Sequence, residues 1–167
     1  MTADITGPLT FRTARSSDVA GIVDLVNSYA AEAIMLYRTP ESVRLTLHDF
    51  VVAVDGDDNV VACGALKEYS PSVAEVASIA VARQAHGRGV GKAIVQAVER
   101  LAQKRDIDEL FALTLTPQFF ESAGYVIADR ADYPEKIRRD CLKCPRRIRC
   151  NEYCVSRQVR EVMAAAA

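Results

Sequence analysis

The sequence predicts an α/β fold, in which a mixed central sheet is flanked by helices and followed by a short cysteine-rich C-terminal tail. Three observations point to this class. Apolar segments of strand length alternate with stretches whose apolar residues recur every three or four positions, as in amphipathic helices. One such helical stretch joins two strand-like segments, which is typical of a parallel crossover. The length of 167 residues, half of them hydrophobic, suits a single globular domain.

The elements are predicted in the order β-α-α-β-β-β-α-β-α-β. The predicted strands are residues 9–14, 50–55, 59–67, 73–82, 109–116 and 125–128. The predicted helices begin near residues 17, 40, 90 and 117 and extend to about residues 29, 48, 103 and 122. Residues 30–37 are partly apolar and match neither pattern.

Caps mark the first two helices. Ser16 or Ser17 begins the first, with Asp18 in its first turn, because a short polar side chain satisfies free N–H groups and negative charge suits a helix N-terminus. The stripe that this helix is expected to bury consists of Val19, Ile22, Val23, Val26 and Tyr29. Thr39 caps the second helix, and Pro40 suits its first position.

Turn residues and apolar periodicity define the later elements. Residues 56–59 read Gly-Asp-Asp-Asn and join two strands as a hairpin. Residues 90–101 carry a continuous apolar helical face that should pack on the sheet. Residues 109–116 are almost entirely apolar, which predicts a parallel strand buried on both faces. Pro117 begins a short helix, and Gly124 ends it.

The stretch at residues 78–92 is the clearest candidate for a ligand site. An apolar strand leads into Gln84, Gly87, Gly89 and Gly91, and then into the long amphipathic helix. Glycines let the backbone approach a ligand closely, and the N-terminus of a helix presents N–H groups and positive charge to an anion. The pattern Gln-x-x-Gly-x-Gly is neither a Walker loop nor the dinucleotide fingerprint. It predicts a phosphate-binding loop.

This loop, between a strand and a helix, resembles that of the GNAT superfamily of acetyl-CoA-dependent N-acetyltransferases, whose pyrophosphate loop follows Gln/Arg-x-x-Gly-x-Gly/Ala. The resemblance implies a GNAT domain over residues 1–130 and acetyl-CoA as cosubstrate. Residues 131–167 are expected to form a C-terminal extension that packs on or near the acceptor site. The residues implied to bind acetyl-CoA are Ile79, Ala80, Val81, Gln84, His86, Gly87, Arg88, Gly89, Val90, Gly91 and Lys92.

Acetyl transfer to an amine needs a base for the amine and a proton donor for the departing thiolate. Glu75 interrupts an otherwise apolar strand, and desolvation there would raise the pKa of its carboxyl group towards the range of a general base. Alternatively, Glu75 faces solvent or is paired with a cation. GNAT enzymes often use a tyrosine as the acid where this chain has Phe120, so the donor is Thr114, Thr116, water or another tyrosine.

Thr114 is the preferred donor because it lies near the C-terminal end of a buried parallel strand, where open α/β sheets usually bind ligands. The alternative is a β-branched strand residue whose hydroxyl is satisfied locally. Direct attack by the amine is favoured over a covalent acetyl-enzyme, because Cys63 lies in the middle of a strand, away from the loop.

Several further segments match one type of GNAT enzyme in order and spacing: residues 35–39, 49–52, 63–66, 74–81, 111–114, 119–125 and 133–136. Together they resemble amino-acid N-acetyltransferases of the N-acetylglutamate synthase type, which act in arginine biosynthesis. Without the amino-acid-kinase-like domain of the long bacterial enzymes, the sequence resembles the short stand-alone form. The resemblance implies that Arg38 binds a carboxylate of glutamate and that Glu75 is the base. It also implies that Thr114 occupies the position at which those enzymes have a serine proposed as the acid. Arg146 is the nearest match to a second substrate arginine.

Four cysteines crowd into the tail at spacings x2, x5 and x3: Cys141, Cys144, Cys150 and Cys154. Four thiols can close a tetrahedral zinc site or hold an iron–sulfur cluster. The alternative is a set of reduced thiols or a redox pair. The interleaved arginines make this segment electropositive, so that it faces an anionic substrate or keeps the thiols ionised.

The composition limits the partners. A net charge of −1 gives no general reason to expect nucleic-acid binding, and no apolar run approaches the ~20 residues of a membrane span. The expected location is cytoplasmic, because the polar first residues lack a signal-peptide core. The expected substrates are acetyl-CoA and L-glutamate, and a homodimer is compatible with the sequence. Glutamine, another small amine or a protein amino group is an alternative acceptor, and a non-catalytic acetyl-CoA sensor is an alternative from another class.

Overall fold

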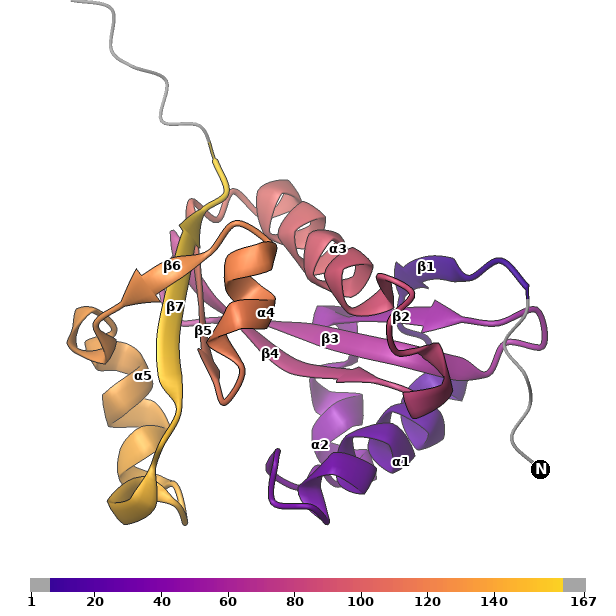
Figure 1. Cartoon of the computed structure of the whole chain (residues 1–167), viewed down its shortest axis with the longest axis horizontal. Helices are drawn as coiled ribbons and strands as arrows, with labels where there is room; N and C mark the ends of the chain where they lie inside the picture. The colour runs from indigo at the N-terminus through magenta and orange to yellow at the C-terminus, as the bar shows by residue number, and fades with distance from the viewer. Residues whose placement is uncertain (1–6, 161–167) are drawn as a thin grey trace, which may run out of the picture. The chain divides into compact units, whose positions relative to one another are not determined.

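The computed structural model describes residues 7–160, which form two compact units. The first unit comprises residues 7–67 and 76–101, and the second comprises residues 68–75 and 102–160. Strand β4 (Val73–Val81) contributes its first three residues to the second unit and the others to the first. Figure 1 shows the elements of both units.

Seven strands form one mixed sheet in the order β1-β2-β3-β4-β5-β7-β6. Besides β4, these are β1 (Thr10–Thr13), β2 (Phe50–Val54), β3 (Val60–Glu68), β5 (Glu109–Thr114), β6 (Val126–Ala128) and β7 (Tyr153–Gln158). β4 and β5 pair in parallel, whereas β1 with β2, β2 with β3, β5 with β7, and β6 with β7 pair antiparallel. The predicted mixed sheet is therefore confirmed.

Helices flank this sheet, as predicted. They are α1 (Val19–Ala30), α2 (Pro40–Leu45), α3 (Val90–Lys104), α4 (Pro117–Ser122) and α5 (Pro134–Arg139). In the first unit, α1 and α2 lie on one face of β2 and β3, and α3 lies on the opposite face (Figure 1). A Cβ atom on Gly64 of β3 would lie 2.7 Å from the side chains of Ile79 and Ile94. Glycine at this position therefore lets α3 pack closely on the sheet.

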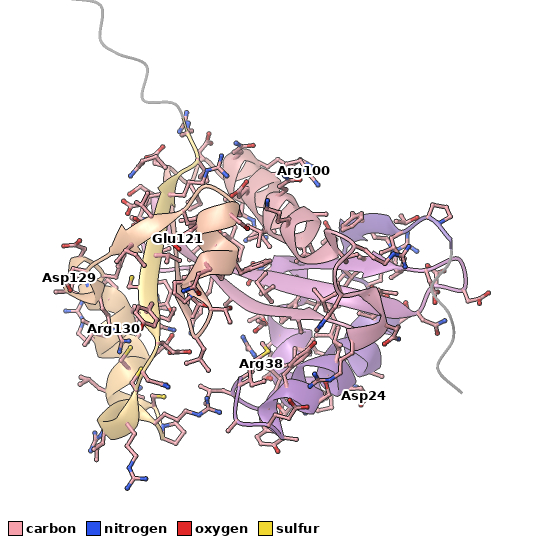
Figure 2. The ribbon with its side chains drawn as sticks, in the orientation of Figure 1. Asp24, Arg38, Arg100, Glu121, Asp129 and Arg130 are labelled. Carbon is pink, nitrogen blue, oxygen red and sulfur yellow. The ribbon has the colours of Figure 1, made fainter. Side chains whose placement is uncertain are left out.

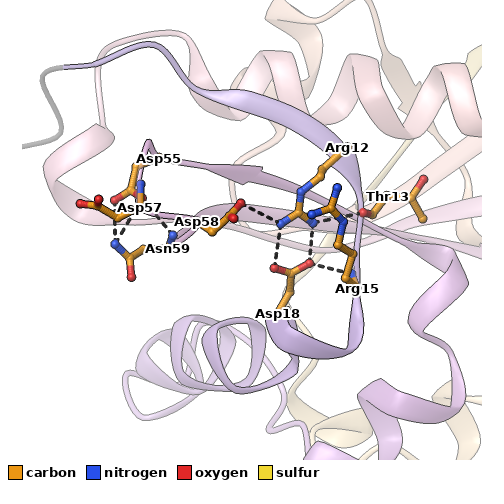
Figure 3. Close-up of polar contacts among 8 residues, drawn as sticks. All are labelled: Arg12, Thr13, Arg15, Asp18, Asp55, Asp57, Asp58 and Asn59. Carbon is orange, nitrogen blue, oxygen red and sulfur yellow. Dashed lines mark hydrogen bonds and ion pairs between the residues drawn. The ribbon is translucent and has the colours of Figure 1, made fainter.

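A partly buried ion pair joins β1 to the start of α1 (Figure 3). The Arg12 guanidinium donates to both carboxylate oxygens of Asp18, at 2.6 and 3.1 Å, and the Arg15 N–H donates to the same carboxylate at 2.6 Å. Asp18 is 2% exposed. Burial raises the pKa of Asp18, but the hydrogen bonds from Arg12 and Arg15 outweigh it and hold that pKa below its usual value.

The second unit contains a strand that the sequence did not predict. β7 lies between β5 and β6 and pairs with β5 from Glu109↔Gln158 to Thr114↔Tyr153. β6 (Val126–Ala128), which was predicted to be the last strand in the chain, therefore lies at the edge of the sheet, and β7 follows it in the chain. β7 was missed because only Cys154 and Val155 among its six residues are buried, so its apolar pattern is short.

The helices differ from the prediction in two places. α2 ends at Leu45, and a short 3-10 turn at Leu47–Asp49 follows it, so the predicted helix to residue 48 is too long. α5 was not predicted.

No helix within residues 7–160 combines the length and the apolar character needed to cross a membrane. The division of the chain at residue 130 stays a prediction.

We predict that Asp18→Asn lowers the free energy of unfolding by about 2 kcal/mol at neutral pH, because it leaves the partly buried Arg12 without its charged partner. Urea unfolding followed by circular dichroism measures this change. Asp58→Asn is the matched control: Asp58 also contacts Arg12, at 3.4 Å, but its side chain is 74% exposed. The control should change stability by less than about 0.5 kcal/mol.

The contribution of the Arg12–Asp18 pair to the free energy of unfolding should depend on pH. Because the pKa of Asp18 is lowered in the folded protein, its contribution is complete above the ordinary aspartate value of about 4 and is lost as the pH falls below it. The stability difference between the wild type and Asp18→Asn should shrink on acidification. A difference that stayed constant down to about pH 2 would contradict this account.

Candidate functional site

The predicted phosphate loop follows the last residue of β4 in the first unit. Ala82 N–H donates to the Val61 carbonyl at 2.7 Å, which ties the start of the loop to β3. One 3-10 turn at Arg83–Ala85 follows, and α3 begins at Val90. The first turn of a helix leaves backbone N–H groups without intrahelical acceptors. The loop therefore has the strand, turn and helix context that the sequence predicted.

Two loop glycines have left-handed backbone conformations. Gly87 has φ +73° and Gly89 has φ +75°. A Cβ atom at either position would meet no heavy atom within 4 Å. Backbone conformation, and not space, therefore requires glycine at these two positions.

Tyr29 of α1 contacts both the end of β4 and the loop that follows it. Its hydroxyl donates to the Val81 carbonyl and lies 2.8 Å from His86 Nε2. The Arg83 guanidinium lies 5.0 Å from the centre of the Tyr29 ring and forms an ion pair with Glu32. Sequence reasoning assigned Tyr29 only to the buried stripe of a helix, because its partners lie more than 50 residues away.

Arg38, the predicted acceptor residue, also belongs to the first unit. It lies on the face of the sheet that carries α1 and α2 (Figure 2). Its backbone N–H and carbonyl bond the amide group of Asn27, at 2.8 and 2.9 Å. Its guanidinium donates to Ser78 Oγ at 3.1 Å and lies 5.8 Å from the centre of the Phe50 ring. Arg38 is therefore held at its backbone and at its side chain.

Ser78 itself has an unusual backbone. It lies within β4 with φ +53°, a left-handed conformation that is rare for residues with a side chain. Its carbonyl accepts a weak hydrogen bond from Cys63 Sγ at 3.5 Å. Such irregularities re-aim side chains along a strand and are common beside active sites.

Glu75, the predicted base, is buried in the second unit and has two side-chain partners. Its Oε2 atom accepts from Lys136 Nζ at 2.9 Å and from the Tyr69 hydroxyl at 2.9 Å. Lys136 Nζ also lies 3.2 Å from Asp140 Oδ2, and the Tyr69 hydroxyl contacts the same Asp140 oxygen. Glu75 is therefore both buried and paired with a cation, and its role as the base stays a prediction.

Aromatic packing fixes this cluster. The Tyr69 ring lies 5.6 Å from the Phe111 ring, and Phe111 stacks on Tyr133 at 4.1 Å. The Arg139 guanidinium lies 4.8 Å from the centre of the Tyr69 ring. These contacts position Tyr69 between β5 and α5, so its hydroxyl reaches both carboxylates.

The charges of the cluster affect the pKa of two members. Burial raises the pKa of Tyr69, and the nearby charges of Glu75 and Asp140 raise it further, so the phenol stays protonated. Burial lowers the pKa of Lys136, but the charge of Glu75 and the hydrogen bonds to both carboxylates outweigh it and raise the pKa above its usual value. Lys136 therefore stays charged at neutral pH.

Thr114, the predicted proton donor, is 8% exposed at the end of β5. Its Oγ1 accepts from the Thr116 N–H at 3.0 Å and lies 3.3 Å from Thr116 Oγ1. Phe120 is buried and packs edge-on against Phe119 and Tyr125, with ring centres 5.2 Å apart in each pair. The role of Thr114 as acid stays a prediction.

The four tail cysteines form no disulfide. Within residues 7–160, no three His, Cys, Asp or Glu side chains are placed so that they could hold a metal ion. Cys150 Sγ instead lies 3.3 Å from the Arg130 guanidinium and 3.7 Å from Glu152 Oε2, and Cys154 is buried in β7. The predicted zinc or iron–sulfur site is therefore not supported.

The second predicted substrate arginine, Arg146, lies within this cysteine segment, between Cys144 and Cys150. It is half-buried, and its N–H donates to Cys144 Sγ at 3.4 Å. Three residues of the Glu75 cluster were missed by sequence reasoning: Tyr69, Lys136 and Asp140. Lys136 lay within a segment that resembled N-acetylglutamate synthases, but its partner Glu75 is 61 residues away.

Two curated relatives cover most of this chain. An uncharacterized N-acetyltransferase of Chlorobaculum tepidum is 36% identical over 141 residues, which are 84% of this chain and 90% of that protein. The amino-acid acetyltransferase of Actinobacillus pleuropneumoniae serotype 5b is 30% identical over 129 residues. That match covers 76% of this chain but only 29% of the longer relative.

Two solved structures are similar as well. N-acetylglutamate synthase from Neisseria gonorrhoeae, complexed with coenzyme A and N-acetyl-glutamate, has a TM-score of 0.82 and 26% identity over 92% of this chain and 36% of that one. Rv2747 from Mycobacterium tuberculosis, in complex with CoA and NLQ, has a TM-score of 0.76 and 25% identity over 89% of this chain and 98% of that one.

The model of the acetyltransferase (GNAT) family matches residues 22–125, from α1 to the residue before β6. This range contains the glycine loop, with its left-handed Gly87 and Gly89, and the buried Glu75 of β4. The predicted fold and family are both confirmed. The chain belongs to the acetyltransferase (GNAT) family and is an acetyl-CoA-dependent acetyltransferase.

Proposed function

We propose that this chain transfers the acetyl group of acetyl-CoA to the α-amino group of L-glutamate. The observation that carries the proposal is the similarity to an N-acetylglutamate synthase bound to coenzyme A and N-acetyl-glutamate, which extends over 92% of this chain. The buried Glu75 and the anchored Arg38 supply a base and a carboxylate-binding cation for this reaction.

In this proposal, the loop binds the pyrophosphate of acetyl-CoA. The left-handed Gly87 and Gly89 turn the backbone so that N–H groups before α3 point towards an anion, and the helix N-terminus adds positive charge. The proposed binding residues are the eleven that the family resemblance implied, from Ile79 to Lys92.

Glu75 acts as the base. It takes one proton from the α-ammonium of glutamate, and the neutral nitrogen then attacks the thioester carbonyl carbon. The C–S bond breaks as the N–C bond forms, and the thiolate of coenzyme A takes a proton from Thr114 or water. Cys63 does not serve as a nucleophile, because burial raises the pKa of its thiol to about 12.

Arg38 binds a carboxylate of the acceptor, with Arg146 as the second cation. A guanidinium can donate two parallel hydrogen bonds to a carboxylate, which an ammonium cannot match. The contact of Arg38 with Ser78 Oγ uses one donor, so the guanidinium keeps others for a ligand. Glutamine, another small amine or a protein amino group remains the alternative acceptor.

Substitution of a left-handed loop glycine should weaken coenzyme A binding. Gly89→Ala should raise the Kd for coenzyme A about fivefold to tenfold, because alanine is strained at φ +75° although its Cβ would meet nothing. Isothermal titration calorimetry measures the Kd. Gly56→Ala, where a Cβ is equally unobstructed and φ is not left-handed, should leave it unchanged. Equal effects of the two substitutions would argue against a conformational role.

The acceptor is tested by thiol release from acetyl-CoA with glutamate, glutamine, aspartate and a lysine peptide. We expect the highest kcat/KM with glutamate. Arg38→Lys should raise KM for glutamate about tenfold, because it loses bidentate binding. Arg44→Lys, on the exposed last turn of α2, is the control. Turnover of the lysine peptide but not of glutamate would reject the proposed acceptor.

The base is tested by Glu75→Gln. We expect kcat to fall about 100-fold or more while the Kd for acetyl-CoA stays the same. Glu109→Gln is the matched control, because Glu109 also accepts from a tyrosine hydroxyl, that of Tyr133. Unchanged turnover would exclude Glu75 as the base, and binding of acetyl-CoA by a wild type without turnover on any acceptor would favour the sensor.

A further inference from the structure

One tyrosine hydroxyl bridges two carboxylates in the second unit. Tyr69 Oη lies 2.9 Å from Glu75 Oε2 and also contacts Asp140 Oδ2. A phenol has one proton and donates it to one acceptor at a time. When it donates to Asp140, its oxygen can accept a hydrogen bond from a protonated Glu75. The arrangement therefore accommodates one additional proton.

One cation contacts both carboxylates. Lys136 Nζ lies 2.9 Å from Glu75 Oε2 and 3.2 Å from Asp140 Oδ2, so its positive charge stabilises either carboxylate when that group is ionised. A second cation, Arg139, lies 4.8 Å from the centre of the Tyr69 ring.

The exposed fraction of the side chain rises from Glu75 to Lys136 to Asp140. The side chain of Glu75 is 8% exposed, that of Lys136 is 13% exposed, and that of Asp140 is 27% exposed. Asp140 is the C-cap of α5 and is the most exposed of these three side chains. A proton on Glu75 is thus one hydroxyl away from a carboxylate that can exchange with solvent.

We propose that Tyr69 and Asp140 form a proton relay that returns Glu75 to its basic form after each turnover. Glu75 Oε2–H gives its proton to Tyr69 Oη while the tyrosine gives its own proton to Asp140 Oδ2. Asp140 then releases that proton to water, and the tyrosine hydroxyl rotates back. Protons balance at every step, and Lys136 stays charged throughout as the counter-ion. The relay rests on the proposed role of Glu75 as base.

The raised pKa of Tyr69 supports this scheme, because a phenol that stays protonated can relay a proton without ionising. The raised pKa of Lys136 keeps the counter-ion in place over the working pH range. Tyr69 and Asp140 are positioning residues here, since they act through Glu75 and not on the substrate.

Kinetics test the relay. Tyr69→Phe keeps the ring contacts with Phe111 and Arg139, and should lower kcat about tenfold without changing KM for the acceptor. Asp140→Asn should do the same, and added imidazole buffer should restore part of its kcat. Tyr133→Phe removes another buried hydroxyl that donates to a carboxylate, and should keep full kcat. An unchanged kcat in Tyr69→Phe, or a loss in Asp140→Asn that no buffer restores, overturns the relay.

A measurement without substrate separates the relay from the proposed function. Carbon-13 NMR of labelled side-chain carboxyl groups follows Glu75 and Asp140 through a pH titration, with Glu75→Gln and Asp140→Asn to assign the signals. If they share a proton, the two carbons show common titration steps. Independent single-step titrations overturn the relay, whichever acceptor the enzyme uses. A wild type that shows common steps but does not acetylate glutamate supports the relay and rejects only the acceptor.

Discussion

A buried carboxylate on β4 sets the main constraint on the second unit. Glu75 cannot stay charged in the interior without a partner, and its own strand supplies none. Lys136 on α5 provides the charge, and Tyr69 provides a hydrogen bond. The chain beyond β6 must therefore return to the sheet. It does so twice, through α5 and through β7, which pairs along the full length of β5.

Sequence reasoning found the features that are local in the chain. The glycine loop is contained within a few residues, and its strand and helix follow from apolar periodicity. Glu75 was found because a carboxylate in an apolar strand is conspicuous. Lys136 and Tyr69 could not be assigned in the same way, because an ion pair across 61 residues leaves no local pattern. Strand β7 was missed for a related reason, because it pairs with β5 and β6, from which it is distant in the chain or separated by α5.

The cysteine segment shows the limit of motif spacing. Its spacings allow four ligands around one metal, but spacing says nothing about the direction of each side chain. Cys154 is fixed by the β7 ladder opposite Leu113, and burial raises the pKa of its thiol to about 11. Cys150 lies against Arg130 and Glu152. The direction of each thiol thus depends on the sheet and on its neighbours, which spacing alone does not predict.

The candidate residues of the two units are held in place by different interactions. Gly87 and Gly89 act through backbone conformation, and a loop of this kind binds phosphate through N–H groups that every residue carries. Glu75 and Arg38 depend on side chains from distant segments: Lys136, Tyr69, Asn27 and Ser78. Substitution of those partners can alter the proposed base and the proposed acceptor contact while the loop stays intact. The fold can therefore keep its cosubstrate and change its acceptor, which is why the loop indicates the family and only the side-chain partners bear on the substrate.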